Sequence, residues 1–190
     1  EAPAPPPDPA GPRPYRAVEL PAVQSPVEFT DDVALDLVQK QAKVVLEIEG
    51  PVVFDRYVRA LAAAWQVQRV TERVRERARE ALPADAVVDG DVVWLDAAQR
   101  DAFAGFRAPG DDARAERSAE ELPPVEVDHA MAWLVRQHHA LAAEDLLRET
   151  ARCFGIQRLG SVVRAVTEAA LDRLVGPGRV VRDGDSVRLP

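Results

Sequence analysis

The stretch Ala151-Arg-Cys-Phe-Gly-Ile-Gln-Arg-Leu-Gly-Ser-Val-Val-Arg164 decides the fold, because a related stretch occurs earlier in the chain. It predicts the end of one helix, a tight corner and the start of another helix. Residues 62–75, Ala-Ala-Ala-Trp-Gln-Val-Gln-Arg-Val-Thr-Glu-Arg-Val-Arg, align with it without a gap at an offset of 89 residues. A Gln-Arg pair stands at both corners. We therefore predict two copies of one helix–corner–helix arrangement.

The first copy extends on both sides of its corner. A helix is predicted from about Thr30 to the Gly50-Pro51 break, and a second from about Asp55 to Trp65, where apolar residues recur at helical spacing. The third runs from about Val70 to Leu82. Residues 86–95 then place an Asp-Gly pair between two short apolar stretches, which favours a β-hairpin.

The second copy repeats this order. Helices are predicted at about 126–138, 143–154 and 159–174, with Gly155 supplying a left-handed residue at the corner. A second Asp-Gly hairpin follows at 179–189, now at an offset of 94 residues. Trp65 and Phe154 take equivalent places as core anchors. The predicted fold is α+β and mostly helical, a tandem winged-helix arrangement of two helix–helix–helix–β-hairpin units.

Four segments are predicted along the chain. Residues 1–27 are rich in proline and are interpreted as an extended, mostly disordered linker. Residues 28–96 form the first winged-helix unit, residues 97–125 an acidic connector, and residues 126–190 the second unit. A short helix is expected near Asp96–Phe103, and Phe103 and Phe106 are expected to pin the connector to a core.

Charge is distributed unevenly. The chain has 190 residues and a net charge of −8, which by itself argues against a nucleic-acid ligand. Residues 83–126 carry 11 acidic and 4 basic side chains, whereas 33–82 carry 7 and 9 and 127–190 carry 8 and 9. The acidity therefore lies outside the two helical units, which are slightly basic.

The apolar and cysteine content excludes further classes of protein. There is no apolar run near the length of a transmembrane helix and no signal peptide, so we predict no membrane partner and a cytoplasmic location. The chain begins at Glu1 rather than Met, which we interpret as a piece of a longer protein. The single cysteine, Cys153, excludes an internal disulfide and is interpreted as a small apolar residue rather than a reactive thiol.

The chain also resembles a family of uncharacterised domains. The matching stretches are Glu49-Gly-Pro-Val-Val53, Phe106-Arg-Ala-Pro109, Glu120-Glu-Leu-Pro-Pro-Val-Glu126 and Gly155-Ile-Gln-Arg-Leu-Gly-Ser161, with Arg179-Val-Val-Arg182 less specific. This family is found at the C-terminus of large superfamily 1 helicase-like proteins, often with a Vsr-type, restriction-endonuclease-like domain upstream. The resemblance implies an accessory module beside helicase and nuclease domains of a parent chain, in bacterial genome maintenance or phage defence.

No residues predict catalysis by this chain. A Walker lysine motif, a glycine-rich phosphate loop and a nucleophile elbow are all missing, so we predict no enzyme activity and no cofactor. His138 and His139 are adjacent and project about 100° apart on a helix, which does not favour a shared metal ion. Paired acids such as Glu120-Glu121 fit a solvated connector better than a catalytic dyad.

Basic and polar residues around the two corners are the candidate nucleic-acid contacts. In a winged helix the third helix can enter the major groove of DNA, and a helix N-terminus can meet phosphate. The ten candidates come from the two corners, the two third helices and the second hairpin. They are Gln68, Arg69, Arg73, Arg75, Arg77, Gln157, Arg158, Ser161, Arg164 and Arg182.

A structural interpretation competes with this one. Glu72, Glu76 and Glu80 alternate with the arginines of the first copy, as in surface ion pairs, and the shared Gln-Arg corner itself can be architectural. Two hypotheses therefore stay open, a DNA-binding module and a protein-docking or dimerisation module. The docking hypothesis expects an open apolar patch on the units.

Overall fold

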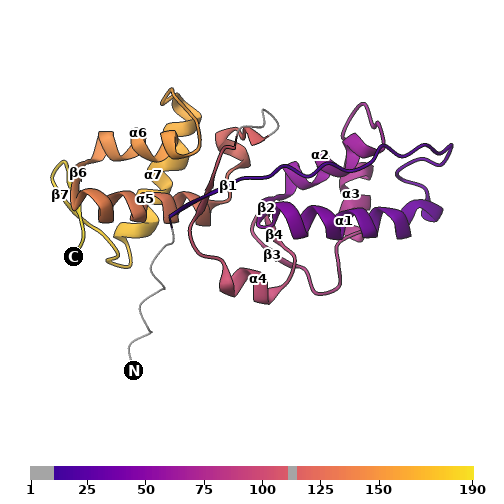
Figure 1. Cartoon of the computed structure of the whole chain (residues 1–190), viewed down its shortest axis with the longest axis horizontal. Helices are drawn as coiled ribbons and strands as arrows, with labels where there is room; N and C mark the ends of the chain where they lie inside the picture. Colours follow the sequence, from indigo (N-terminus) through magenta and orange to yellow (C-terminus); the bar gives the residue numbers. More distant parts are fainter. Residues whose placement is uncertain (1–10, 111–114) are drawn as a thin grey trace. The chain divides into compact units, whose positions relative to one another are not determined.

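The computed structural model describes residues 11–110 and 115–190. The chain is α+β and forms two compact units. The N-terminal unit is Arg16–Phe103, and the C-terminal unit combines residues 11–15 with the described residues from Ala104 to Pro190. Helices α1, α2 and α3 lie together in the first of these units, and α5, α6 and α7 lie together in the second (Figure 1).

The N-terminal unit consists of a helix, a short strand, two helices and a hairpin. Its three-stranded antiparallel sheet has the order β2-β4-β3, so the strand between the first two helices pairs with the second strand of the hairpin. Its elements are the 3-10 turn Asp32–Ala34, α1 (Leu35–Glu49), β2 (Val52–Val53), α2 (Phe54–Ala64), α3 (Glu72–Glu80), β3 (Val87–Asp89), β4 (Val92–Trp94) and α4 (Ala97–Ala102).

The C-terminal unit has the same order of elements and adds a parallel strand pair, β1 with β5. Its three-stranded sheet has the equivalent order β6-β8-β7. Its elements are β1 (Pro12–Pro14), β5 (Phe106–Ala108), the 3-10 turn Ala119–Glu121, α5 (Pro124–His138), β6 (Ala140–Ala142), α6 (Ala143–Cys153), α7 (Ser161–Val175), β7 (Val181–Asp183) and β8 (Ser186–Arg188).

The internal repeat is confirmed at the offset read from the sequence. Helices α1 and α5 have the same length and begin at Leu35 and Pro124, 89 residues apart, and α2 and α6 keep that offset. The hairpin strands β3 and β7 are 94 residues apart, as predicted. One backbone hydrogen bond occurs in both units. The first amide of α2 donates to the Asp91 carbonyl at 2.7 Å, and the first amide of α6, 89 residues later, donates to the Asp185 carbonyl, 94 residues after Asp91, also at 2.7 Å.

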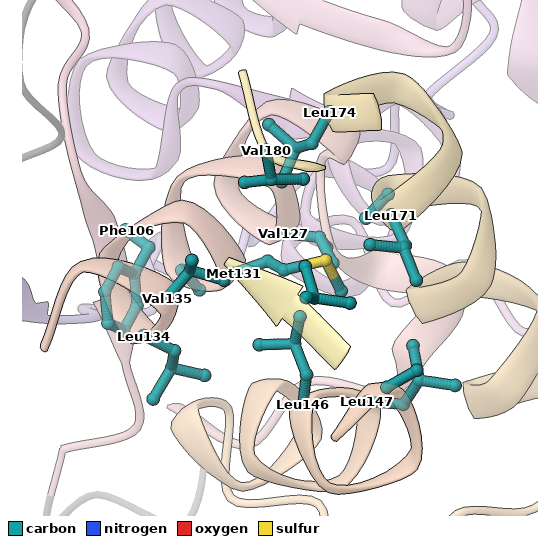
Figure 2. Packing of buried hydrophobic residues seen from close by; sticks show 14 of the residues in the cluster. Phe106, Val127, Met131, Leu134, Val135, Leu146, Leu147, Leu171, Leu174 and Val180 are labelled. Atoms are coloured by element: carbon teal, nitrogen blue, oxygen red, sulfur yellow. The ribbon is translucent and has the colours of Figure 1, made fainter. Parts of the chain in front are cut away.

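Each unit encloses its own apolar core. In the N-terminal unit the core is built mainly from α1 and α2, with Val38, Val45, Leu46, Tyr57 and Leu61 fully buried. In the C-terminal unit, side chains of α5, α6 and α7 converge, and Figure 2 shows Met131 of α5 among the labelled residues of the other two helices.

The predicted core anchors both pack inside, but to different extents. Phe154 is buried and its ring meets Phe106 at 5.7 Å between centroids. Trp65 is half-buried, donates its indole N–H to the Gln41 side chain at 2.7 Å, and meets Phe29 edge-on at 5.8 Å. The short helix predicted near Asp96–Phe103 is α4, and Phe106 pins the connector as expected.

Residues 11–27 contain strand β1 and otherwise no helix or strand, and parts of this segment pack against one or the other unit. Pro12–Pro14 forms β1, and Tyr15 is buried in the C-terminal unit with its amide donating to Ala108 at 2.7 Å. From Arg16 onward the segment packs on the N-terminal unit through Val18 and Leu20. Residues 1–10 of the proposed linker lie outside the described residues. Within the described parts of the chain, no helix is both long and apolar enough to cross a membrane.

Candidate nucleic-acid interface

The two corners have the same backbone geometry. Gln66 and Gly155 take equivalent places after α2 and α6, and both have a positive φ, 55° and 78° respectively. Their amides donate to carbonyls three residues earlier, at 3.1 Å for Gln66 and 2.9 Å for Gly155. The left-handed residue predicted at Gly155 is confirmed, and the other copy achieves the same turn without glycine.

The corner glutamines close this turn. The Gln68 side-chain amide donates to the Gln66 carbonyl at 3.1 Å, and the Gln157 amide donates to the Gly155 carbonyl at 3.5 Å. Both glutamines are exposed, so their amide oxygens still face solvent. Their recurrence is accounted for by the turn itself, independently of any ligand.

Arg75 and Arg164 tie the third helix of each unit to the second. Arg75 binds the Asp55 carboxylate at the start of α2, and Arg164 binds Glu144 at the start of α6 with two hydrogen bonds of 2.8 and 2.9 Å. The hydrogen bonds from these arginines hold the pKa of both carboxyl groups below their ordinary values. Because the acidic residue and the basic residue each recur 89 residues later, we interpret this ion pair as structural.

The Arg77 side chain binds residues at the start of the N-terminal unit. It is 8% exposed and donates to the Thr30 carbonyl at 2.9 Å and to Asp32 at 2.8 Å. Its guanidinium also lies 3.1 Å from Glu80. A side chain buried among these acceptors is not available to a phosphate without breaking them.

The remaining candidates are exposed. Among the described residues, no ion pair involves Arg69, Arg73, Arg158 or Arg182, and Ser161 is the first residue of α7. Arg69 and Arg158 occupy the same place in the two corners. The corner pair thus divides into a glutamine that closes the turn and an arginine that projects to solvent.

The N-termini of α3 and α7 differ in charge. Thr71 caps α3, its hydroxyl accepting from the Val74 amide at 3.4 Å, and Glu72 lies in the first turn. Gly160 precedes α7 without a side-chain cap, and the first turn of α7 contains no acidic residue. At α7 the first amide groups and the positive end of the helix dipole have no side-chain partner and are open to an anion, whereas at α3 the Thr71 hydroxyl already binds one amide and Glu72 places a negative charge in the first turn.

The two hairpins also differ. The exposed residues of the β3–β4 hairpin are Val88, Gly90 and the two aspartates of its turn, with no basic side chain. The second hairpin has Arg179 just before β7, Arg182 in it and Arg188 in β8, all exposed. Arg182 and Arg188 donate to neighbouring carbonyls at 3.3 and 3.0 Å, which leaves their remaining N–H groups toward solvent.

The start of α6 links the second hairpin to α7. Ala143 at this start donates to Asp185 in the β7–β8 turn at 2.7 Å, and the next residue, Glu144, binds Arg164 one turn into α7. The basic hairpin and the first turns of α7 therefore lie on either side of one helix end. Arg179 was not among the sequence candidates, because nothing in its flanking residues relates it to α7.

The histidines and the cysteine do not gather into a metal-ligand cluster in the described part of the chain. Within the described residues, no group of three or more His, Cys, Asp or Glu side chains is arranged to hold a metal ion. Cys153 is half-buried, and burial raises the pKa of its thiol to about 11, which keeps it protonated near neutral pH. This agrees with the interpretation of Cys153 as a small apolar residue.

Comparison with known proteins gives one family match. Residues 27–76 match a family described as "Protein of unknown function (DUF3320)", a stretch that covers α1, α2 and the first half of α3. No curated protein and no solved structure matches the chain. The match supports an uncharacterised domain family.

The matched stretch includes Glu49-Gly-Pro, whose roles are structural. Glu49 is 2% exposed and accepts from the Val18 amide at 2.8 Å and from Arg56 at 2.7 Å. A Cβ on Gly50 would lie 2.4 Å from the Leu46 carbonyl and 2.6 Å from the Gln99 side chain, so no larger residue fits without rearrangement. The contacts of Glu49 and Gly50 account for this stretch through packing rather than through a ligand.

Proposed function

We propose that the chain is a pair of winged-helix units and that the C-terminal unit binds duplex DNA. The order helix, strand, helix, helix, hairpin supports this fold, together with the pairing of the first strand to the last in both units. In DNA-binding proteins of the helix-turn-helix type, the N-terminal residues of the recognition helix reach the base edges. In this proposal α7 is the recognition helix and the β7–β8 hairpin is the wing.

One observation carries the assignment to the C-terminal unit. The N-terminus of α7 has neither a side-chain cap nor an acid in its first turn, and three exposed arginines belong to its corner and hairpin, Arg158, Arg179 and Arg182. Such a surface attracts phosphate through both the helix dipole and the guanidinium groups. The equivalent surface of the N-terminal unit holds Glu72 and Glu76 beside Arg69 and Arg73, so its field largely cancels.

Acidic side chains limit how the duplex lies. Glu168 and Asp172 are exposed farther along α7, and Asp183 and Asp185 flank the hairpin turn. Like charges repel phosphate, so contact is confined to the first turns of α7 and the arginine-bearing strands. The proposed complex is therefore of modest affinity, salt-sensitive and directed mainly at the DNA backbone.

We further propose that this is a non-catalytic accessory module of a larger helicase- or nuclease-type protein of the bacterial cytoplasm. The resemblance of its motifs to C-terminal domains of helicase-like proteins supports that context, as does the family match over residues 27–76. In such a setting the module holds DNA near a motor that resides elsewhere in the parent chain, in genome maintenance or phage defence. DNA and the neighbouring helicase and nuclease domains are the proposed partners.

The test is a titration of the chain against a labelled duplex of about 20 base pairs at about 50 and 200 mM salt. Binding should weaken steeply at the higher salt. The double variant Arg158→Glu/Arg182→Glu should bind at least about tenfold more weakly at low salt, because two phosphate contacts are lost. The slope of log affinity against log salt concentration should also fall by about one for each removed arginine.

The matched control is Arg69→Glu/Arg73→Glu, which changes the same number of charges in the N-terminal unit. It should shift the dissociation constant by less than about twofold, after correction for the common change in net charge. Absence of binding at the lower salt would overturn the proposal. Equal losses in the two double variants would overturn the assignment to the C-terminal unit.

A further inference from the structure

Helix α1 carries an exposed apolar stripe on its outer face. Val33, which precedes the helix, is 80% exposed, and Leu37, Val44 and Ile48 are 42%, 37% and 43% exposed. Their spacings of four, seven and four residues place them on one side of the helix. Aliphatic side chains exposed singly are ordinary, but a contiguous stripe of four along one helix marks a surface that binds another chain.

The internal repeat shows what covers the equivalent face in the other unit. At the offset of 89 residues, the four equivalent positions are Leu122, just before α5, and Glu126, Trp133 and Gln137 on α5. Leu122 is 6% and Glu126 0% exposed, whereas Gln137 is exposed. Strand β5 and the residue before it cover the middle of this face, at Glu126 and Trp133. Phe106 packs on Trp133 with ring centroids 5.7 Å apart, and the Arg107 amide donates to Glu126 at 2.9 Å. An extended segment therefore occupies the face of α5 that corresponds to the open face of α1.

Three positions on the two faces correspond at the offset of 89 residues. Glu126, which binds Arg107 in the covered face, is replaced by Leu37. His129, whose ring Nδ1 lies 2.8 Å from the Gly105 carbonyl, is replaced by Lys40. Trp133 is replaced by the smaller Val44, which leaves room for a larger apolar side chain.

The same comparison defines the occupant by its chemistry. Opposite Leu37 an arginine would lose its carboxylate partner, so an apolar residue is required there. Opposite Lys40, which makes no ion pair within the described residues, a backbone carbonyl or a carboxylate is complementary. A groove of about 470 Å³ adjoins the stripe, lined in part by Lys40, Lys43, Leu82 and Pro83, and it offers space for a second apolar side chain.

Charges beside the stripe bear on whether a second copy of this chain is the occupant. Asp36, Lys40, Lys43 and Glu47 follow one another along its border. Parallel copies of α1 would bring each charge onto itself, and like charges in a desolvated contact are repulsive. Antiparallel copies that pair Leu37 with Val44 would place Lys40 against Gln41 rather than against an acidic group, so a different sequence complements Lys40 better.

We propose that the outer face of α1 is a docking surface for an extended, apolar segment of another polypeptide, which lies on it as β5 lies on α5. The segment places an aromatic residue against Val44, an apolar residue against Leu37, and a carbonyl or carboxylate against Lys40. This role is independent of DNA binding, because it uses the N-terminal unit and none of the residues assigned to the DNA surface.

The probes are two synthetic peptides. One has the sequence of residues 104–109, Ala-Gly-Phe-Arg-Ala-Pro, and the other carries leucine in place of its arginine. Each is titrated into the isotope-labelled full chain and followed by NMR chemical shifts. Shifts should map to the stripe on α1, and the leucine peptide should bind at least about threefold more tightly than the arginine peptide.

Leu37→Glu supplies the decisive variant, because it places a carboxylate where α5 has Glu126. The preference should reverse, with the arginine peptide now binding more tightly. Val44→Glu should abolish both shifts, while the control Val88→Glu, which alters an exposed valine of the β3–β4 hairpin in the same unit, should leave them unchanged. Dispersed amide signals in each spectrum verify folding.

Three outcomes overturn the proposal. The first is that neither peptide shifts residues of α1, and the second is that Leu37→Glu leaves the order of affinities unchanged. The third is a dimer in sedimentation velocity that Val44→Glu dissociates, since a second copy would then occupy the face.

Discussion

At the scale of single residues, Glu126 is the most enclosed charge in the described chain. Its carboxylate is fully buried and accepts from Arg117 at 2.8 Å and from Arg107. The Arg117 guanidinium lies over the Tyr15 ring at 4.0 Å. Burial opposes ionisation, but the attraction of Arg117 and Arg107 outweighs it and places the pKa of Glu126 below its ordinary value of 4.5.

This environment predicts the effect of Glu126→Gln. Removing the charge takes a shared carboxylate away from two partly or fully buried arginines, which should lower the free energy of unfolding by about 3–5 kcal/mol at neutral pH. Because the folded-state pKa is depressed, the stabilisation is complete above 4.5 and is lost as the pH falls through the folded-state value. Urea titrations should therefore show the gap between wild type and variant narrowing below pH 4.5. A gap that is independent of pH would contradict this account.

At the scale of elements, the corner between the second and third helices needs a residue of positive φ, and the two units use different residues there. Gly155 meets its positive φ without strain, and a Cβ there would lie 2.9 Å from Pro109. Gln66 adopts the same region at φ 55°, where a side chain is unfavourable. The two copies thus offer opposite substitutions at one structural position.

Opposite signs are predicted for this pair. Gly155→Ala should destabilise the chain by about 1–2 kcal/mol, since it adds left-handed strain and crowds Pro109. Gln66→Gly should stabilise it by about 0.5–1 kcal/mol, because relief of strain exceeds the added entropy of the unfolded chain and the loss of a 3.4 Å hydrogen bond to Val23. Thermal unfolding of both variants measures this, and equal signs would show that the corners are not equivalent.

The elements were predictable from the sequence because apolar periodicity and turn residues are local signals. The helix offset of 89 residues and both Asp-Gly hairpins were predicted on that basis. Strands β1 and β5 were not predicted, because proline in β1 weakens any strand signal and the partner lies more than 90 residues away. The first helix also begins later than Thr30, since Asp32–Ala34 forms a 3-10 turn.

The candidate site was predictable only in part, for a similar reason. The glutamates interleaved with the arginines of α3 suggested partners on the same helix, which holds for Arg79 and Glu72 at 2.9 Å. Arg75 instead binds Asp55 on α2, and Arg77, besides pairing with Glu80 on its own helix, binds Asp32 before α1. Which arginines stay exposed depends on tertiary contacts across 20 to 45 residues, and a single sequence carries no local sign of them.

At the scale of the whole molecule, the chain path crosses between the units. Residues 11–15 belong to the C-terminal unit, Arg16–Phe103 form the N-terminal unit, and the chain then returns at Ala104. Tyr15 is the last residue of the first passage and is 3% exposed, stacked on Arg117. The segment just before the N-terminal unit therefore completes the core and the charge cluster of the other unit.

Tyr15→Ala should consequently destabilise the C-terminal unit, although the N-terminal unit is the one that follows Tyr15 in the sequence. Losing a buried aromatic ring costs about 3 kcal/mol, which corresponds to roughly a hundredfold faster exchange of the most protected amides. Hydrogen exchange should accelerate from Ala104 to Pro190 and remain unchanged in Arg16–Phe103. Val18→Ala, three residues later, is the control: Val18 packs on the N-terminal core, so the accelerated amides should be those of Arg16–Phe103. Acceleration of both units by either variant would mean that they unfold as one cooperative body.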